Sequence, residues 1–182
     1  RKLLILLAVL FVAHVPAQAQ ESYPVVEIFG GYSYLSAEIL DDREGLGVPG
    51  FIVSVAGNPS PYIGIVGEIS GHYGNVTRTG VTPDPQFDAD VYYFLFGPRF
   101  TARRGNINLF AHTLIGAART KVEFADSETD FAFAIGGGMD INASKEIAVR
   151  LFQVDYAPIR ANGDTAHNFR FALGFVYRFV KE

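Results

Sequence analysis

The chain has 182 residues, no cysteine, 19 glycines and a formal net charge of −4, with 14% aromatic and 19% charged residues. The acidic balance argues against a nucleic-acid-binding protein, which needs a basic surface. The lack of cysteine excludes disulfide frameworks and zinc–cysteine sites, and we expect no cofactor. The length suits one domain, and the glycine and aromatic content favours many short strands and turns.

The first 19 residues have the pattern of an export signal. Arg1 and Lys2 precede a short apolar run, which ends in Ala17-Gln18-Ala19. A charged start, a short apolar middle and an A-x-A site are typical of a secretory signal peptide. The run is too short to cross about 30 Å of hydrocarbon as a helix. We therefore expect residues 1–19 to be a signal peptide and residues 20–182 to form the folded domain.

Eight segments of alternating polarity follow the predicted signal peptide. We expect strands at residues 25–35, 48–56, 62–73, 88–102, 106–121, 130–143, 147–158 and 168–179. The first, third, fifth and seventh connections are long or polar, whereas the second, fourth and sixth are short. Long loops on one side and short turns on the other are typical of a membrane barrel with both termini in the periplasm. The predicted fold is all-β, an eight-stranded antiparallel up-and-down transmembrane β-barrel.

The last segment indicates which face of the wall meets lipid. Its alternate residues are large and apolar, ending in Phe175, Tyr177 and Phe179, whereas Arg170 and Arg178 share the other face. An arginine that faces the bilayer midplane costs about 2–4 kcal/mol. We therefore expect the aromatic face to point into lipid and a polar network to fill the interior. Its predicted members are Glu27, Glu68, His72, Arg99, Asp140, Arg170 and Arg178.

The interior of an eight-stranded barrel is just wide enough to be filled by side chains, so we expect no wide pore. Two segments leave the facing of their polar residues open. In the fifth, His112 and Arg119 have opposite parity, which requires an outward position near an interface or a β-bulge. In the seventh, Arg150 has the opposite parity to Gln153 and Asp155.

Several segments together resemble the OmpA/OmpX-type family of outer-membrane β-barrels. They are the signal-like start, residues 26–34 (VEIFGGYSY), residues 96–100 (FGPRF) and the final strand that ends in phenylalanine. The resemblance implies location in the bacterial outer membrane and contact with its lipid. It also implies that Phe179, with Tyr177 and Phe175 behind it, is the signal read by the barrel-assembly machinery. Val180, Lys181 and Glu182 follow Phe179, which departs from a strictly terminal aromatic residue.

Three functions are compatible with this pattern. The first is a structural or surface-display role, in which the long loops adhere to or bind an extracellular partner. The second is a soluble, lipocalin-like periplasmic barrel carrying an apolar ligand, which would point the aromatic ladder of residues 169–179 inward. The third is a barrel-embedded lipid hydrolase built on Glu68, Ser70 and His72, although residues along one strand face do not converge as a catalytic triad must.

Overall fold

Ten β-strands make up the described part of the chain. The computed structural model describes residues 23–37, 46–77, 86–122, 127–161 and 164–180, so the predicted signal peptide lies outside the described residues. Within these ranges no helix is long and apolar enough to cross a membrane. The strands are β1 (Pro24–Ala37), β2 (Leu46–Gly57), β3 (Ile63–Thr77), β4 (Gln86–Arg104), β5 (Ile107–Val122), β6 (Glu128–Asn142), β7 (Ile147–Tyr156), β8 (Ile159–Ala161), β9 (Asp164–Ala166) and β10 (Phe169–Val180).

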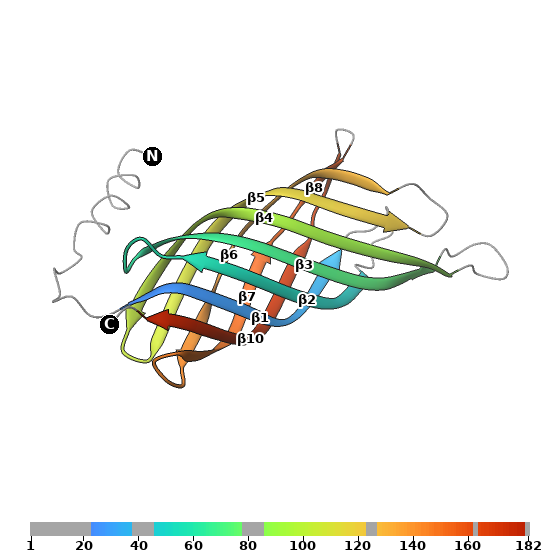
Figure 1. Cartoon of the computed structure of the whole chain (residues 1–182). Coiled ribbons are helices and arrows are strands. Elements are labelled where there is room, and N and C mark those ends of the chain that lie inside the picture. The colour runs from blue at the N-terminus through green and yellow to red at the C-terminus, as the bar shows by residue number, and fades with distance from the viewer. Residues whose placement is uncertain (1–22, 38–45, 78–85, 123–126, 162–163, 181–182) are drawn as a thin grey trace, which may run out of the picture.

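The eight long strands close into a barrel, as Figure 1 shows. Strands β1 to β7 pair antiparallel in chain order, and β10 pairs with both β7 and β1. The pairing of β5 with β6 completes the circle. This confirms the predicted eight-stranded antiparallel barrel, in which every backbone edge within the bilayer finds a partner.

The connections differ strongly between the two ends of the barrel. At the end where β1 begins and β10 ends, short turns join β2 to β3, β4 to β5 and β6 to β7 (Figure 1). We call this the turn end, and the opposite end the loop end. The turn between β4 and β5 consists of Gly105 and Asn106, whereas the sequence pattern placed it at residues 103–105. Gly105 has a φ of 56°. Glycine adopts this left-handed conformation without steric cost.

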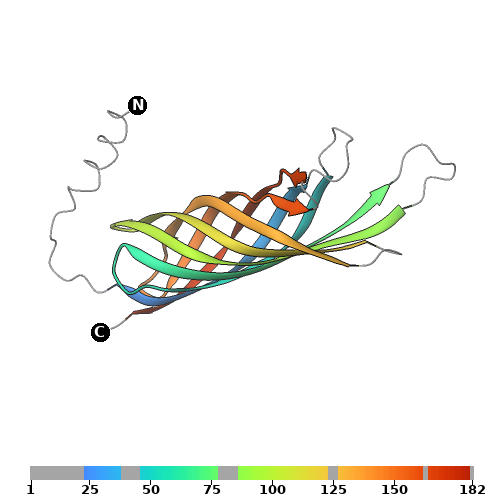
Figure 2. The ribbon, with the colours of Figure 1, turned by 90° about the horizontal axis from the view of Figure 1, so that it is seen from above.

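Two connections at the loop end contain more strand than predicted. Residues 74–87 were expected to form a loop, but β3 and β4 continue to pair as far as Thr77 and Gln86 and project beyond the wall (Figure 2). Residues 159–167 were also expected to be a loop, but they include the hairpin of β8 and β9, which pairs with β6. Backbone hydrogen bonds extend both ladders where polar side chains interrupt the apolar alternation.

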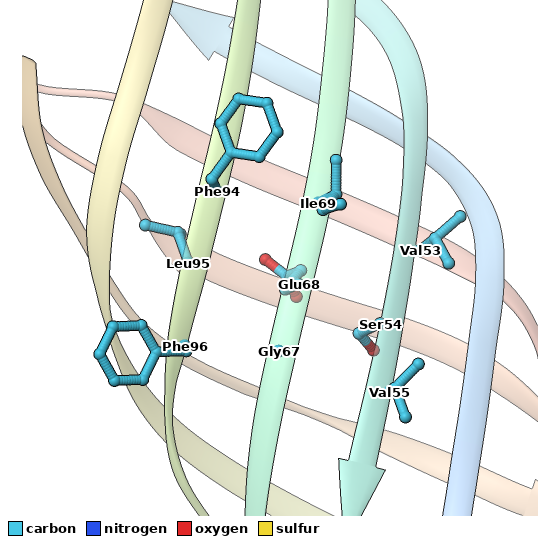
Figure 3. A pocket seen from close by; sticks show the side chains of 9 residues that line it. All are labelled: Val53, Ser54, Val55, Gly67, Glu68, Ile69, Phe94, Leu95 and Phe96. Carbon is cyan, nitrogen blue, oxygen red and sulfur yellow. The ribbon is translucent and has the colours of Figure 1, made fainter. Parts of the chain in front are cut away.

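Side chains alternate between the outside and the interior of the wall. Phe175, Tyr177 and Phe179 expose 67%, 45% and 47% of their surface, so the aromatic ladder faces outward. The lipocalin-like alternative is therefore wrong, because it requires these rings to lie in a central cavity. Figure 3 shows the same alternation on β2 to β4, where outward Phe94, Phe96 and their apolar neighbours surround a shallow recess over Gly67.

The structure shows which way the polar side chains of β5 and β7 face, and the two strands differ. Strand β5 keeps one register with both neighbours, and His112 points inward while Arg119 is exposed and donates to Ser127 Oγ (2.8 Å). Strand β7 instead contains a β-bulge at Leu151 and Phe152, both of which are exposed. The extra residue changes the parity of the strand, so residues on both sides of the bulge point into the interior.

Candidate functional site

Three ion pairs join directly opposed residues on neighbouring strands. Glu27 on β1 lies opposite Arg178 on β10, with 3.1 Å between Oε1 and Nε. Asp140 on β6 and Arg150 on β7 pair at 2.8 Å. Asp155 on β7 and Arg170 on β10 pair at 2.6 Å. All six side chains are buried, so each charge is compensated by a neighbour that the sheet register places beside it.

Two further ion pairs cross the lumen. Arg99 on β4 donates to Glu27 on β1, and Arg170 on β10 donates to Glu68 on β3. Neither pair joins adjacent strands. These contacts therefore connect strands that are separated in the wall of the barrel. One member of each cross-lumen pair also belongs to an ion pair within the sheet, Glu27 with Arg178 and Arg170 with Asp155.

A cluster of arginines surrounds Glu27 at the turn end. Arg99, Arg103 and Arg178 all lie within ion-pair distance of its carboxylate, Arg103 at 3.6 Å. Asn58, from the turn between β2 and β3, donates to Glu27 Oε2 (3.2 Å) and to the carbonyl of Pro24 (2.8 Å). The turn is thereby attached to the base of the charged network.

Arg150 adjoins this cluster and lies between two aromatic rings of the interior. Its guanidinium carbon lies 4.0 Å from the ring centre of Phe29 and 4.1 Å from that of Phe110. Its Nε and Nη2 both donate to Asp140, at 2.8 and 3.2 Å. A guanidinium stacked between two rings and held by a bidentate carboxylate is fixed in position. Arg150 therefore forms a cross-barrel layer with Phe29 and Phe110.

A second polar group fills the middle of the barrel. Gln153 accepts from Arg150 Nη1 (2.7 Å) and donates to Asp155 (2.8 Å), which links the two groups. Asp155 also contacts His112 Nε2 at 2.8 Å. Arg170, which is fully buried, donates to Ser70 Oγ at 2.9 Å in addition to its carboxylate partners. The network of hydrogen bonds and ion pairs is thus continuous from Glu27 to Ser70.

The residues of the hydrolase hypothesis do not form a triad. The His72 imidazole shares a hydrogen bond with Ser33 Oγ (2.9 Å), whereas Ser70 and Glu68 bind Arg170. His72 Nδ1 has no hydrogen-bond partner among the described residues, so no carboxylate orients the ring as a catalytic triad requires. Ser33 and His72 are both fully buried. In the described ranges, no group of three or more His, Asp or Glu side chains could hold a metal ion.

The seven residues expected in the interior are all buried, but the structure groups them unequally. Glu27, Arg99, Asp140 and Arg178 gather at the turn end, Glu68 and Arg170 meet in the middle, and His72 lies apart toward the loop end. Sequence reasoning missed further members of the network. They are Asn58, Arg103, His112, Asn142, Arg150, Gln153 and Asp155.

Comparisons with known proteins agree with this architecture. A family model described as "Outer membrane protein beta-barrel domain" matches residues 5–179. No curated protein sequence matches the chain. The structure is similar to that of Neisserial surface protein A (NspA), with a TM-score of 0.69 and 7% identity over 88% of this chain and 100% of that one. It is also similar to Ail, the attachment invasion locus protein of Yersinia pestis, with a TM-score of 0.57 and 18% identity over the same shares.

Proposed function

Because the chain belongs to the outer membrane protein beta-barrel domain family, we propose that it is a non-enzymatic outer-membrane scaffold that displays its long connections to an extracellular partner. The observation that carries the proposal is the contrast between a filled interior and an extended loop end. The barrel offers little room for transport, whereas the loop end carries the longest connections.

The filled interior argues against a wide pore. Arg150 lies between Phe29 and Phe110, and the cross-lumen pairs of Arg99 and Arg170 connect strands that are separated in the wall. Eight-stranded barrels of this kind are occupied by their own side chains. In a structural and display role, such a barrel supports the connections at its loop end.

The loop end favours display. β4 is the longest strand, with 19 residues, and it pairs with β3 as far as Gln86. At about 3.4 Å per residue, such a strand is longer than the tilted crossing of the hydrocarbon requires. The β3–β4 and β5–β6 hairpins project at this end (Figure 2). NspA and Ail carry names that refer to the surface and to attachment, which supports the same role here as a proposal.

An adhesion assay tests the proposal. The full chain is expressed in the outer membrane of a non-adherent host, and binding of the cells to cultured epithelial cells is measured. Replacing residues 78–85 with a Gly-Ser segment of equal length is expected to lower adhesion to the level of the empty vector. The matched control replaces Lys145 and Glu146, both exposed in the turn between β6 and β7, with serine and is expected to leave adhesion unchanged.

Two results would contradict the proposal. One is adhesion of cells with the unaltered chain that equals the empty-vector level, measured against several cell lines and matrix proteins. The other is turnover of bilayer lipid by the purified chain that His72→Ala abolishes, which would restore the hydrolase hypothesis. Heat-modifiable gel migration of each variant confirms that the barrel has folded.

A further inference from the structure

Positive charge is in excess at the turn end of the lumen. Four guanidiniums gather there, those of Arg99, Arg103, Arg150 and Arg178, against the two carboxylates of Glu27 and Asp140. The side chain of Arg103 is 18% exposed, and the other five are almost completely buried. Like charges that are removed from water repel strongly unless a counter-charge lies among them. The cluster is therefore short of negative charge by two units.

The same arginines have donors without acceptors. Among the described residues, no hydrogen-bond partner exists for Nε of Arg99, for Nε and Nη2 of Arg103, or for Nη2 of Arg178. The hydroxyl of Thr101, which lies between Arg99 and Arg103 on the same face of β4, also has no partner in the described part of the chain. Arg103 Nη2 is 3.6 Å from Glu27 and Arg178 Nη2 is 3.8 Å from Asp140, beyond hydrogen-bond distance.

The resident carboxylates are held by other donors and do not reach these free donors. Glu27 Oε1 accepts from Arg178 Nε, and Oε2 accepts from Arg99 and Asn58. Asp140 accepts from Arg150 with both oxygens. A buried charged donor without an acceptor is costly. A bound molecule can supply the acceptors that these carboxylates do not reach, and the charge excess favours an anion.

We propose that the turn end of the lumen is a binding site for a phosphate-type oxyanion, held by Arg99, Arg103, Arg178 and Thr101. Phosphate and sulfate oxygens match the planar fork of a guanidinium and accept several charge-assisted hydrogen bonds at once. Arg103 lies beside the turn of Gly105, and its Nη1 donates to the carbonyl of Pro61. Its partial exposure gives access from the turn end, to free phosphate or to the phosphate of a lipid headgroup.

Calorimetric titration of the full chain with inorganic phosphate tests the site. The protein is held in a non-ionic detergent, so that no headgroup phosphate is present, and sodium chloride is titrated at matched ionic strength. Phosphate is expected to bind saturably and chloride not. Arg103→Gln should raise the dissociation constant about tenfold or more, as for a lost hydrogen bond to a charged group. Arg104→Gln, an exposed neighbour with the same change of charge, should leave it unchanged.

A second variant separates geometry from charge. Thr101→Val keeps the charge and the volume of the side chain but removes the hydroxyl, and it should raise the dissociation constant about fivefold. Heat-modifiable migration is checked for each variant. In a parallel titration, short-chain phosphatidylglycerol replaces inorganic phosphate. If Arg103→Gln weakens binding in this titration alone, the anion that the site binds is the phosphate of a lipid headgroup. Non-saturable binding in both arms, equal binding of chloride, or equal loss in Arg104→Gln would overturn the proposal.

Discussion

His112 on β5 and Asp155 on β7 meet across Gly136 on the strand between them, with 2.8 Å between Nε2 and Oδ1. The sheet register places Gly136 directly opposite both residues. A β-carbon at Gly136 would lie 2.1 Å from the Asp155 carboxylate and 2.3 Å from the carbonyl oxygen of Val154. The missing side chain is therefore what allows an imidazole and a carboxylate two strands apart to touch.

Gly136→Ala is accordingly expected to lower the free energy of unfolding by about 1–3 kcal/mol, the usual cost of overpacking a filled interior. Urea unfolding of the protein in lipid or detergent measures this change. Gly67→Ala is the matched control, because a β-carbon on the outward-facing Gly67 meets no atom within 4 Å. Its effect should stay within about 0.5 kcal/mol, and equal losses in the two variants would refute the explanation.

Replacing Arg170 should lower the free energy of unfolding much more than replacing Glu68. Arg170 contacts both Glu68 and Asp155, so Arg170→Met leaves two buried carboxylates without their shared cation. Breaking a buried pair in this way costs about 3–5 kcal/mol. Glu68→Gln leaves the pair of Arg170 with Asp155 intact and should cost about 1–3 kcal/mol.

Urea unfolding of both variants gives the comparison, with Arg160→Met, an exposed residue of β8, as the control for loss of an arginine. The control should unfold like the unaltered chain. A larger loss of stability in Glu68→Gln than in Arg170→Met would mean that Asp155 alone does not hold the guanidinium.

Arg150 is expected to keep the lumen closed. Arg150→Ala removes the guanidinium between Phe29 and Phe110 and also leaves Asp140 without its bidentate partner. We expect a loss of stability of about 3–5 kcal/mol and the appearance of ionic current in planar bilayers. The unaltered chain is expected to show no large, stable conductance. Arg119→Ala, on the exposed face of β5, should conduct no more than the unaltered chain. An unchanged current in Arg150→Ala would show that other side chains close the barrel.

The fold could be predicted because one physical rule decides it. Alternation of large apolar residues with charged ones in the last strand, from Phe169 to Phe179, is compatible with only one facing in lipid, and that facing holds in the structure. Parity then places Glu27, Arg99 and Arg178 on the buried face without knowledge of any contact.

Parity failed where the backbone does not keep a period of two. The bulge at Leu151 and Phe152 brings Arg150 to the same side as Gln153 and Asp155, and no residue in that segment signals a bulge on its own. Contacts across the lumen could not be predicted from the sequence either, because they depend on which strands face each other after the barrel closes. Arg99 with Glu27 and Arg170 with Glu68 join strands that are distant in the sheet.

The end of β10 carries the predicted assembly signal, and its outer face is available to a partner. Tyr177 and Phe179 point outward with their rings 5.0 Å apart in an edge-to-face arrangement, and the strand pairs with both β1 and β7. Contacts of this kind contribute little to a wall that already faces lipid. Phe179→Ala should therefore change the free energy of unfolding in detergent by less than about 1 kcal/mol.

Assembly in cells should respond differently, because the resemblance to outer-membrane barrels assigns Phe179 to recognition by the assembly machinery. Phe179→Ala is expected to lower the heat-modifiable, folded fraction in the outer membrane several-fold. Phe171→Ala is the matched control, since it removes an outward-facing phenylalanine of similar exposure from the same strand. If both variants assemble equally well, Phe179 is not the assembly signal. If Phe179→Ala is equally defective in spontaneous folding into detergent, the phenylalanine acts through stability and not through recognition.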